Sequence, residues 1–427
     1  MSRRRLRRQN APAAQVREPQ EQRTLVFPKE HRAITTAVVI LVAIGVVMVY
    51  SASSASNALS SGGQGTGLLL RTLGLGVLPG FLLLWFLQRI PLDTIGRHSK
   101  ILMGLALFPI AAVLLPGVGQ SINGAQRWIN LGVTSFQPSE IGKLALVLYV
   151  AHLAVTRSQT LGNLKSAFKF VMWPIFLTAV LIAKEPDLGT ALVCVATGLT
   201  IVWMAGMPLR VLAPILGSAV MAVLLFAVAS PYRAARLTAF LHPWAHQADS
   251  GFQSVQGQIA LGSGGILGVG PGQSVQKIFY LPEAHTDFIL AVIGEELGVV
   301  GILVVLGLFG AILRAGMNIA RDAVDPYAKL TAAGLTALIT CQAMLNIWVV
   351  LGIAPLTGVP LPFISYGPTN LIVLLCSTGL LLNIAATGGT RLRAVPDIDA
   401  STSEDWDADS DRSRRDSRAR DSRAQRR

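Results

Sequence analysis

Long apolar runs separated by short polar segments make up most of the sequence. A helix that crosses a hydrocarbon layer of ~30 Å needs about 20 residues at ~1.5 Å per residue. The runs that approach this length cover residues 33–53, 68–88, 99–117, 139–155, 168–184, 189–206, 209–230, 286–313, 327–351 and 370–389. The run at 139–155 is the least apolar, because it contains Lys143, Tyr149 and His152. The pattern predicts an all-α fold: a polytopic integral membrane protein of about ten transmembrane helices.

The basic residues predict which side of the membrane each connecting segment occupies. Short loops rich in Lys and Arg stay in the cytoplasm, and an even number of spans puts both termini on one side. The Arg-rich N-terminus is therefore predicted to be cytoplasmic, together with the C-terminus and the links at 89–98, 156–167, 207–208 and 314–326. The extracytoplasmic face receives 54–67, 118–138, 185–188, 231–285 and 352–369. The large loop 231–285, between the seventh and eighth spans, is the longest, and a loop of this length is usually functional.

Composition agrees with a membrane protein. Hydrophobic residues make up 52% of the chain, charged residues 14%, and mean hydropathy is +0.54, whereas roughly a quarter of the residues in soluble domains are charged. The net charge of +13 does not indicate nucleic-acid binding, because the basic excess lies in the terminal segments and the short loops. Segments 1–32 and 392–427 are polar, and we expect two disordered cytoplasmic tails around a transmembrane domain at 33–391. The first segment is too polar for a signal peptide.

One polar cluster precedes the fourth predicted span on the extracytoplasmic face. Arg127 and Trp128 suit an interfacial anchor, and Ser139 is the expected N-cap of the span. Glu140 and Lys143 share one helix face at i, i+3 and are expected to pair. Anchoring and capping explain most of this cluster, but a charged pair at the edge of the hydrocarbon is costly and favours a functional role. Both interpretations stay open.

Two further extracytoplasmic segments combine turn residues with polar side chains. In the link between the fifth and sixth spans, Asp187 is expected to cap the next helix, an interpretation that we prefer to catalysis. Segment 357–367 contains repeated Pro and Gly in an apolar setting, which predicts a re-entrant segment buried within the protein. Ser365 and Tyr366 are expected to line a polar cleft there.

The large loop contains a glycine-rich stretch at 262–272. A dinucleotide-binding motif is excluded, because no βαβ unit surrounds these glycines. A phosphate-binding nest of backbone N–H groups and a flexible re-entrant turn are equally compatible with the sequence.

Three ionisable residues, Glu283, His285 and Asp287, lie where the large loop enters the eighth span. A lone His with two carboxylates at this spacing is a weak zinc pattern, so no metal site is predicted. A carboxylate at the edge of the hydrocarbon is partly desolvated, which raises its pKa, and Asp287 is therefore a candidate general base. Glu295 and Glu296 follow inside the span and must face the bundle interior or a polar cavity.

These stretches resemble the SEDS family (shape, elongation, division and sporulation proteins). The resemblance lies in 123–144 (NGAQRWINLG to SFQPSEIGKL), 185–192 (EPDLGTAL), 232–265 (YRAARLTAFLHPW to GFQSVQGQIALGSGG), 277–298 (KIFYLPEAHTDFILAVIGEELG) and 352–367 (GIAPLTGVPLPFISYG). The sequence at 280–285 is more similar to the cell-division branch than to the elongation branch. The chain departs from the family at Gly367-Pro368-Thr369-Asn370, where a second glycine and small hydroxyl residues are usual.

The resemblance implies a peptidoglycan glycosyltransferase that polymerises lipid II at the outer face of the bacterial cytoplasmic membrane. The family's essential aspartate falls on Asp287, which implies that Asp287 deprotonates the GlcNAc C4 hydroxyl of lipid II. That oxygen would attack the glycan strand linked to undecaprenyl diphosphate. We expect the leaving diphosphate to be bound by Lys277, Arg127, Arg233 and Arg236. We expect the substrate cleft to be completed by Glu283, His285, Glu140, Lys143 and Ser365.

Cofactors and partners are also implied by the resemblance. No tightly bound cofactor is expected, although a divalent cation, Mg²⁺ or Mn²⁺, could assist. The implied partners are a class B penicillin-binding protein with transpeptidase activity, other cell-division proteins and membrane lipid, and the implied location is the division septum.

Three alternatives stay open at this point. A lipid II flippase would also need many spans with polar groups inside, but it would need them on both faces, whereas here they cluster on one. A polymerase for cell elongation and a scaffold for division proteins are the other two. The sequence favours a division polymerase.

Overall fold

The computed structural model describes residues 29–60, 67–122, 125–130, 132, 135–228, 231–278, 280–282 and 284–392. The predicted tails 1–32 and 392–427 lie outside these residues, apart from Lys29–Arg32 and Leu392, which are helical.

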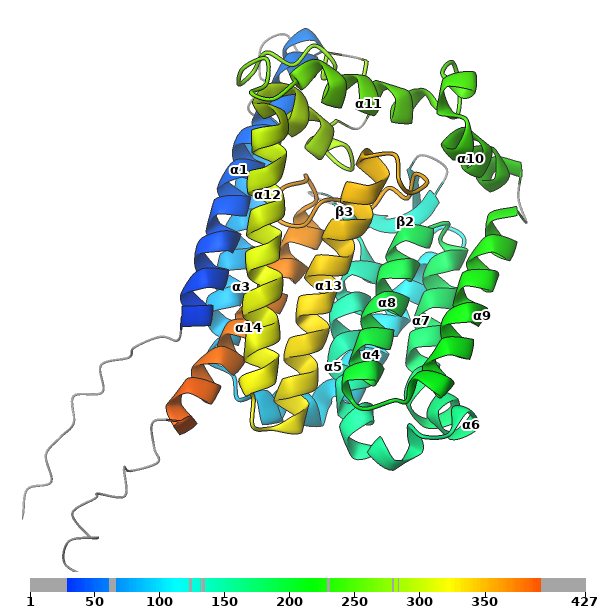
Figure 1. The fold of residues 1–427 in the computed structure, drawn as a ribbon, viewed down its shortest axis with the longest axis vertical. Coiled ribbons are helices and arrows are strands. Elements are labelled where there is room, and N and C mark those ends of the chain that lie inside the picture. The colour runs from blue at the N-terminus through cyan, green and yellow to red at the C-terminus, as the bar shows by residue number, and fades with distance from the viewer. Residues whose placement is uncertain are drawn as a thin grey trace, which may run out of the picture.

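Helices account for most of the described residues (Figure 1). In the first half of the chain they are α1 (Lys29–Ser60), α2 (Gly67–Arg71), η1 (Thr72–Val77), α3 (Leu78–Leu87), α4 (Leu92–Val113), α5 (Pro138–Thr156), η2 (Ser158–Thr160), α6 (Leu164–Ala167), η3 (Phe168–Met172) and α7 (Trp173–Lys184). In the second half they are α8 (Leu188–Met204), α9 (Leu209–Val228), α10 (Pro231–Leu241), η4 (Pro243–His246), α11 (Phe252–Gly264), α12 (Ile289–Asp322), α13 (Pro326–Val350) and α14 (Pro368–Leu392).

Each predicted span overlaps one helix or a run of helices joined end to end. Within the described chain, seven helical segments are long and apolar enough to cross a membrane, and in two of them short helices join end to end, at 67–87 and 164–184. α8 and α9 are shorter apolar helices. The remaining predicted span, 99–117, overlaps α4, whose first turns carry Asp93, Arg97 and Lys100. The predicted class, an all-α polytopic membrane protein, is confirmed.

The elements gather at two ends of the bundle (Figure 1). The start of α1 and the end of α14 point toward one end, whereas α10, α11 and the short strands lie at the other. The strands form one three-stranded antiparallel sheet, β1 (Gln120–Ile122), β2 (Ala125–Asn130) and β3 (Ser135–Phe136), in which Ile129 lies opposite Phe136. The extracytoplasmic segments of the prediction therefore share one end of the molecule.

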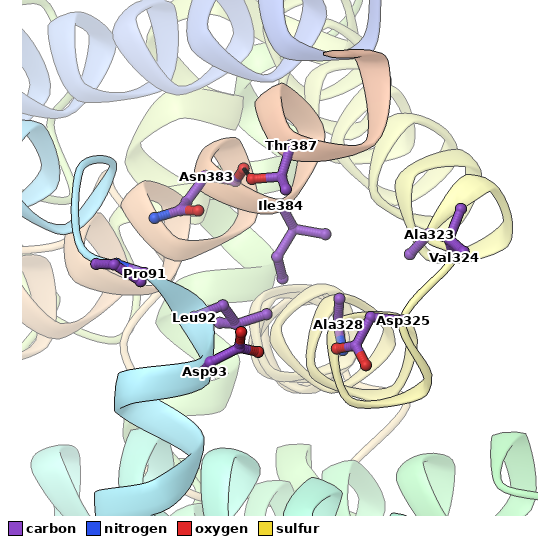
Figure 2. A pocket seen from close by; sticks show the side chains of 10 residues that line it. All are labelled: Pro91, Leu92, Asp93, Ala323, Val324, Asp325, Ala328, Asn383, Ile384 and Thr387. Carbon is purple, nitrogen blue, oxygen red and sulfur yellow. Dashed lines mark hydrogen bonds between the residues drawn. The ribbon is translucent and has the colours of Figure 1, made fainter. Parts of the chain in front are cut away.

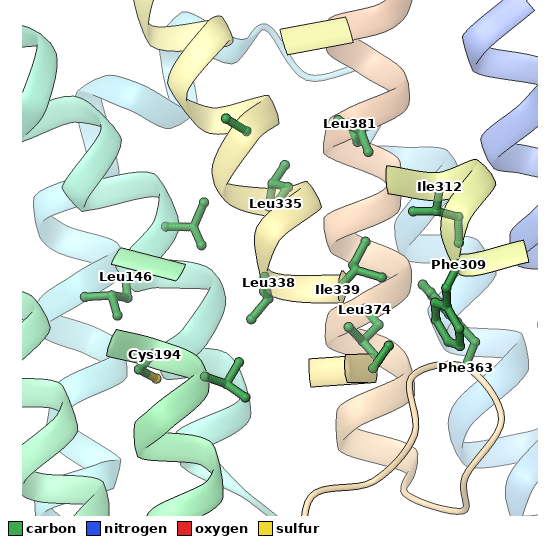
Figure 3. Close-up of a cluster of buried hydrophobic side chains, with 14 of the residues drawn as sticks. Leu146, Cys194, Phe309, Ile312, Leu335, Leu338, Ile339, Phe363, Leu374 and Leu381 are labelled. Atoms are coloured by element: carbon green, nitrogen blue, oxygen red, sulfur yellow. The ribbon is translucent and has the colours of Figure 1, made fainter. Parts of the chain in front are cut away.

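The core is centred on α13, which contacts α5, α8, α12 and α14. Leu335, Leu338 and Ile339 of α13 lie between two groups of apolar side chains (Figure 3). One group includes Leu146 of α5 and Cys194 of α8, and the other is drawn from α12, α14 and the segment before α14. The buried face of such a helix can carry polar side chains only if they find partners inside the protein.

The start of α5 corrects one prediction. The N-cap position belongs to Gln137, and Pro138 is the first helical residue, so the prediction that Ser139 caps this helix was wrong. Proline suits the first position because the N–H group that it lacks would have no partner inside the helix. The Ser139 hydroxyl is buried within the first turn.

The glycine-rich part of the large loop packs into a break in α12. Gly298 has a left-handed φ of 66° and interrupts the helix. The N–H groups of Val269 and Gly270 donate to the carbonyl oxygens of Glu295 and Glu296, at 2.9 and 3.1 Å. Those carbonyls would otherwise accept from the next helical turn. Neither a phosphate nest nor a flexible turn describes the segment, because α12 occupies these N–H groups.

On the other side of the break the hydrogen bonds run in the opposite direction. The N–H groups of Val299 and Val300 donate to the carbonyl oxygens of Gly265 and Ile266, at 3.1 and 3.3 Å. The loop therefore supplies both the donors and the acceptors that the broken helix lacks, as irregular backbone in an apolar surrounding requires.

The side chains of Glu295 and Glu296 hold the next part of the loop. They are 2% and 1% exposed, which confirms that they face the bundle interior. Glu295 accepts from the Ser274 hydroxyl and from the N–H of Val275. Glu296 accepts from the Gly272 N–H at 2.9 Å. Four backbone hydrogen bonds and these two carboxylates anchor the segment 265–277 to α12.

We expect Gly298→Ala to destabilise the folded protein strongly. A left-handed conformation alone costs a residue with a Cβ about 1–2 kcal/mol, and the new Cβ would lie 2.3 Å from the Ile266 carbonyl oxygen. The matched control is Gly307→Ala in the same helix, where a Cβ meets nothing within 4 Å. The midpoint of thermal unfolding in detergent should fall for the first variant and stay within error for the second. Equal midpoints would contradict the packing described for the break.

Candidate active site

Asp287 lies at the junction between the large loop and α12, and it is half-buried. The side chains of Gln253 and Thr286 donate to its Oδ1, each at 3.3 Å. Gln253 comes from α11, which lies close to the start of α12 because Gly257 of α11 packs on the ring of Phe288. A Cβ added to Gly257 would lie 2.5 Å from Cε1 of Phe288. The carboxylate of Asp287 is therefore oriented by a helix that belongs to the loop.

His285 contacts Tyr366, the residue that follows Ser365 in the chain. The rings of His285 and Tyr366 are 5.7 Å apart, and the N–H of Tyr366 donates to the carbonyl oxygen of His285 at 2.9 Å. Burial raises the pKa of Tyr366, and the nearby cation Arg71 opposes the shift. The Ser365 hydroxyl oxygen accepts from the Leu361 N–H at 2.8 Å and closes a turn. The prediction that segment 357–367 is buried holds for its apolar side chains.

A second cluster contains Arg127 and Asp187. The Asp187 carboxylate accepts from the N–H of Thr190 at 3.1 Å, which confirms that it caps α8. Its Oδ2 also lies 3.3 Å from Arg127 Nη1 and accepts from Gln137 at 3.2 Å. The Arg127 side chain is 22% exposed, so it combines an ion pair with access to solvent.

Glu140 and Lys143 form the predicted ion pair, at 2.8 Å, and both are almost fully buried. Lys143 Nζ also donates to Gln342 Oε1 of α13 at 2.7 Å. Removing one member of a buried pair leaves an uncompensated charge, which costs far more than an exposed pair contributes. The pair therefore fixes α5 against α13 whatever further role it has.

Glu185 lies next to the Arg127–Asp187 cluster and has an unusual environment. It is fully buried, and within the described chain neither of its carboxylate oxygens has a hydrogen-bond partner. Burial, with a smaller contribution from the neighbouring Asp187 carboxylate, raises the pKa of Glu185 to about 8, although Arg127 opposes the shift. At neutral pH this side chain is mostly a neutral carboxylic acid.

Lys277 is held by the contacts that anchor segment 265–277 to α12. Its ammonium group lies 2.8 Å from a Glu296 oxygen and donates to the Ser51 hydroxyl of α1 and to the Gly272 carbonyl oxygen, at 3.0 and 2.7 Å. The residue is 6% exposed. These contacts give Lys277 a structural role, and its expected contact with diphosphate stays a prediction.

The other predicted site residues are only partly described. Arg236 lies on α10 and is half-buried. Arg233 is also on α10, but its side chain is outside the described part of the structure, as is the whole of Glu283. Among the described residues, no group of three His, Cys, Asp or Glu could hold a metal ion. Assistance by Mg²⁺ or Mn²⁺ stays a prediction.

Sequence reasoning missed several polar residues in and beside these clusters, among them Gln253, Gln342, Asn346 and Arg71. Gln342 and Asn346 had a detectable signal, because they are polar residues spaced at i, i+4 inside an apolar run. Gln253 had none, since the fold of the loop alone brings it to Asp287.

A cavity of about 300 Å³ lies at the other end of the bundle (Figure 2). It opens between the start of α4, the link from α12 to α13 and the last turns of α14, and Asp93, Asp325 and Asn383 are among its lining residues. None of the predicted site residues lines it.

Asp287, Arg127 and Lys277 themselves all lie in the stretches that carry the family resemblance. A model of the family described as cell cycle protein, which covers FtsW, RodA and SpoVE, matches residues 31–388. The chain belongs to this family. The predicted membership of the SEDS family is thereby confirmed.

Relatives in this family are similar over most of their length. The chain is 41% identical over 352 residues to the "Probable peptidoglycan glycosyltransferase FtsW" of Hahella chejuensis, over 81% of this chain and 87% of the relative. It is 38% identical over 350 residues to the "Stage V sporulation protein E" of Bacillus subtilis, over 81% of this chain and 94% of the relative.

Solved structures agree with the fold. One is a chain from a structure described as "Structural coordination of polymerization and crosslinking by a peptidoglycan synthase complex". Its TM-score is 0.69 at 27% identity, over 85% of this chain and 99% of that chain. The rod shape determining protein RodA of Thermus thermophilus has a TM-score of 0.60 at 28% identity, over 85% of this chain and 97% of that chain.

The raised pKa of Glu185 predicts how its removal changes pH stability. A carboxyl whose pKa rises on folding stabilises the folded state fully below its ordinary value of 4.5, and the contribution is lost as the pH rises through about 8. Glu185→Gln cannot ionise. Its stability relative to the wild type should therefore increase by up to ~1.4 kcal/mol per pH unit across this window and then level off. Thermal unfolding of both proteins at several pH values measures this difference, and a difference that is constant with pH would contradict the assignment.

Proposed function

We propose that this chain is a peptidoglycan glycosyltransferase that polymerises lipid II at the outer face of the bacterial cytoplasmic membrane. One observation carries the proposal: within a FtsW/RodA/SpoVE fold, Asp287 stands half-buried at the mouth of α12, oriented by Gln253 and Thr286. A base in this position is partly shielded from water yet can be reached from the loop side, as proton abstraction from a sugar hydroxyl requires.

In the proposed reaction Asp287 accepts the proton of the GlcNAc C4 hydroxyl of lipid II. The C4 oxygen attacks the anomeric carbon of the MurNAc residue at the lipid-linked end of the strand. The bond to undecaprenyl diphosphate breaks, the diphosphate leaves with the electron pair, and inversion gives a β-1,4 link. General-base assistance of this kind contributes ~10²–10⁴-fold to the rate.

The leaving diphosphate needs cationic partners near the membrane surface. Arg127 and Arg236 are the described candidates with some exposure, and Arg233 precedes Arg236 by one helical turn on α10. Lys277 would have to exchange contacts with Glu296 for contacts with phosphate. Its share in diphosphate binding is therefore expected to be smaller than that of the arginines.

The substrate cleft is proposed to lie between the Asp287 junction, segment 357–367 and the start of α5. His285 and Ser365 would line it from one side, and the Glu140–Lys143 pair would support it from the other. Glu283 belongs to the proposed cleft by its position four residues before Asp287.

Cell division is the proposed setting, with both termini in the cytoplasm and the protein at the septum. Several relatives are named FtsW, which supports division over elongation. The proposed partner is a class B penicillin-binding protein, because a similar chain belongs to a complex that polymerises and crosslinks peptidoglycan. The start of α1 and the end of α14 point toward the same end of the bundle, as the proposed topology requires (Figure 1).

Asp287→Asn is expected to lower lipid II polymerisation at least ~100-fold, because the amide cannot accept the proton. The measurement is glycan strand formation from labelled lipid II by the protein reconstituted with its transpeptidase partner. Asp249→Asn is the matched control, since Asp249 lies in the same loop with its side chain 74% exposed.

Near wild-type polymer from a folded Asp287→Asn protein would refute the proposed base. Transfer of lipid II between leaflets without any polymer would instead identify a flippase.

A further inference from the structure

Two side-chain amides lie one turn apart on the same face of α13. Gln342 is 0% exposed and Asn346 is 1% exposed. Buried amides need hydrogen-bond partners, so the identity of their partners shows what the two positions require.

Asn346 holds the backbone of Asp287. Its Nδ2 donates to the carbonyl oxygen of Asp287 at 2.7 Å and to the carbonyl oxygen of Val359 at 2.8 Å. The reverse amide orientation would face an oxygen toward two carbonyl oxygens, so the contacts fix the orientation. The Asn346 Oδ1 is buried and has no partner among the described residues. The site therefore needs the two donors and tolerates the unpaired acceptor.

Gln342 makes the corresponding contacts one turn away. Its Nε2 donates to the Pro360 carbonyl oxygen at 3.0 Å and to Asn370 Oδ1 at 3.1 Å. These acceptors turn Oε1 toward Lys143, whose Nζ donates to it at 2.7 Å. This hydrogen bond gives a structural role to Asn370, which belongs to the unusual sequence at the start of α14.

The two amides meet at one short piece of backbone. Val359 accepts from Asn346 and Pro360 accepts from Gln342, so residues 359–360 are fixed to α13 at both carbonyls. The same segment is fixed to α8, because Gly189 packs so closely on Val359 that a Cβ would lie 2.3 Å from it. A continuous chain of hydrogen bonds and this shared backbone joins Asp287 to the Glu140–Lys143 pair.

We infer that Gln342 and Asn346 are positioning residues that hold the proposed base, Asp287, in register with the Glu140–Lys143 pair across the substrate cleft. The inference rests on the proposed function. A base must lie within hydrogen-bond reach of the hydroxyl that it deprotonates, and a displacement of 1 Å can lower the rate by about 100-fold. Asn346 controls where the backbone just before α12 places Asp287, and Gln342 controls where Lys143 lies opposite.

The test compares kcat with KM for lipid II in the reconstituted complex. Asn346→Leu and Gln342→Met keep the approximate side-chain size and remove the donors. We expect kcat to fall about 10–100-fold while KM changes less than about threefold, because substrate contacts stay in place and the base moves. Asn346→Ser, which keeps one donor, should fold even where the leucine variant does not, and should lose less of kcat.

The control is Thr336→Val, which removes a buried hydroxyl from the same helix. Thr336 is 0% exposed and donates only to the Ala332 carbonyl oxygen of its own helix. The kcat of Thr336→Val should stay within about twofold of the wild-type kcat. The double variant of Gln342 and Asn346 should lose less than the product of the single losses, since both act on residues 359–360.

Folded amide variants that keep wild-type kcat, or that lose affinity alone, would overturn the inference, as would an equal loss in Thr336→Val. If Asp287→Asn is inactive while the amide variants are active, only the inference fails. If Asp287→Asn polymerises lipid II, the proposed function itself fails.

Discussion

The break in α12 at Gly298 is the constraint on which the end of the molecule that carries Asp287 depends. An interrupted helix in an apolar surrounding must find partners for its free N–H and carbonyl groups. Here the large loop supplies them from residues 265–270, so the loop cannot leave without exposing that backbone. Because α11 precedes this segment and Asp287 follows it, the requirement of the broken helix also fixes the place of the proposed base.

Buried polar side chains extend the same logic across the bundle. Lys277 neutralises Glu296, and Glu295 accepts hydrogen bonds from the Ser274 hydroxyl and the Val275 N–H of segment 265–277. Lys143 is balanced by Glu140, and Asp187 by Arg127. Each buried charge in these clusters has a partner, as the cost of desolvation demands. The result is a polar layer at one end of an apolar bundle. Glu185 is the exception, and it meets the same cost by holding its proton.

The sequence predicted the features that follow from a local pattern of residues. It failed for the contacts that depend on how distant parts of the chain fold together. Apolar length found ten segments that all fold into helices, and i, i+3 spacing found the Glu140–Lys143 pair. Desolvation cost correctly turned Glu295 and Glu296 inward. The cap at Ser139 was wrong because the helix already starts at Pro138, with Gln137 at the cap position. No local pattern could show that the glycine-rich stretch completes α12, or that Gln253 and Asn346 meet Asp287, because these contacts join residues far apart in the chain.

The central claim is that the polar layer with Asp287 faces away from the cytoplasm, and site-specific labelling tests it directly. Tyr280 is 53% exposed at this end, and Val324 is 67% exposed in the link from α12 to α13 at the other. A cysteine at position 280 should react with a membrane-impermeant maleimide on intact cells, whereas one at position 324 should react only after permeabilisation. The opposite pattern would place Asp287 in the cytoplasm and contradict the account.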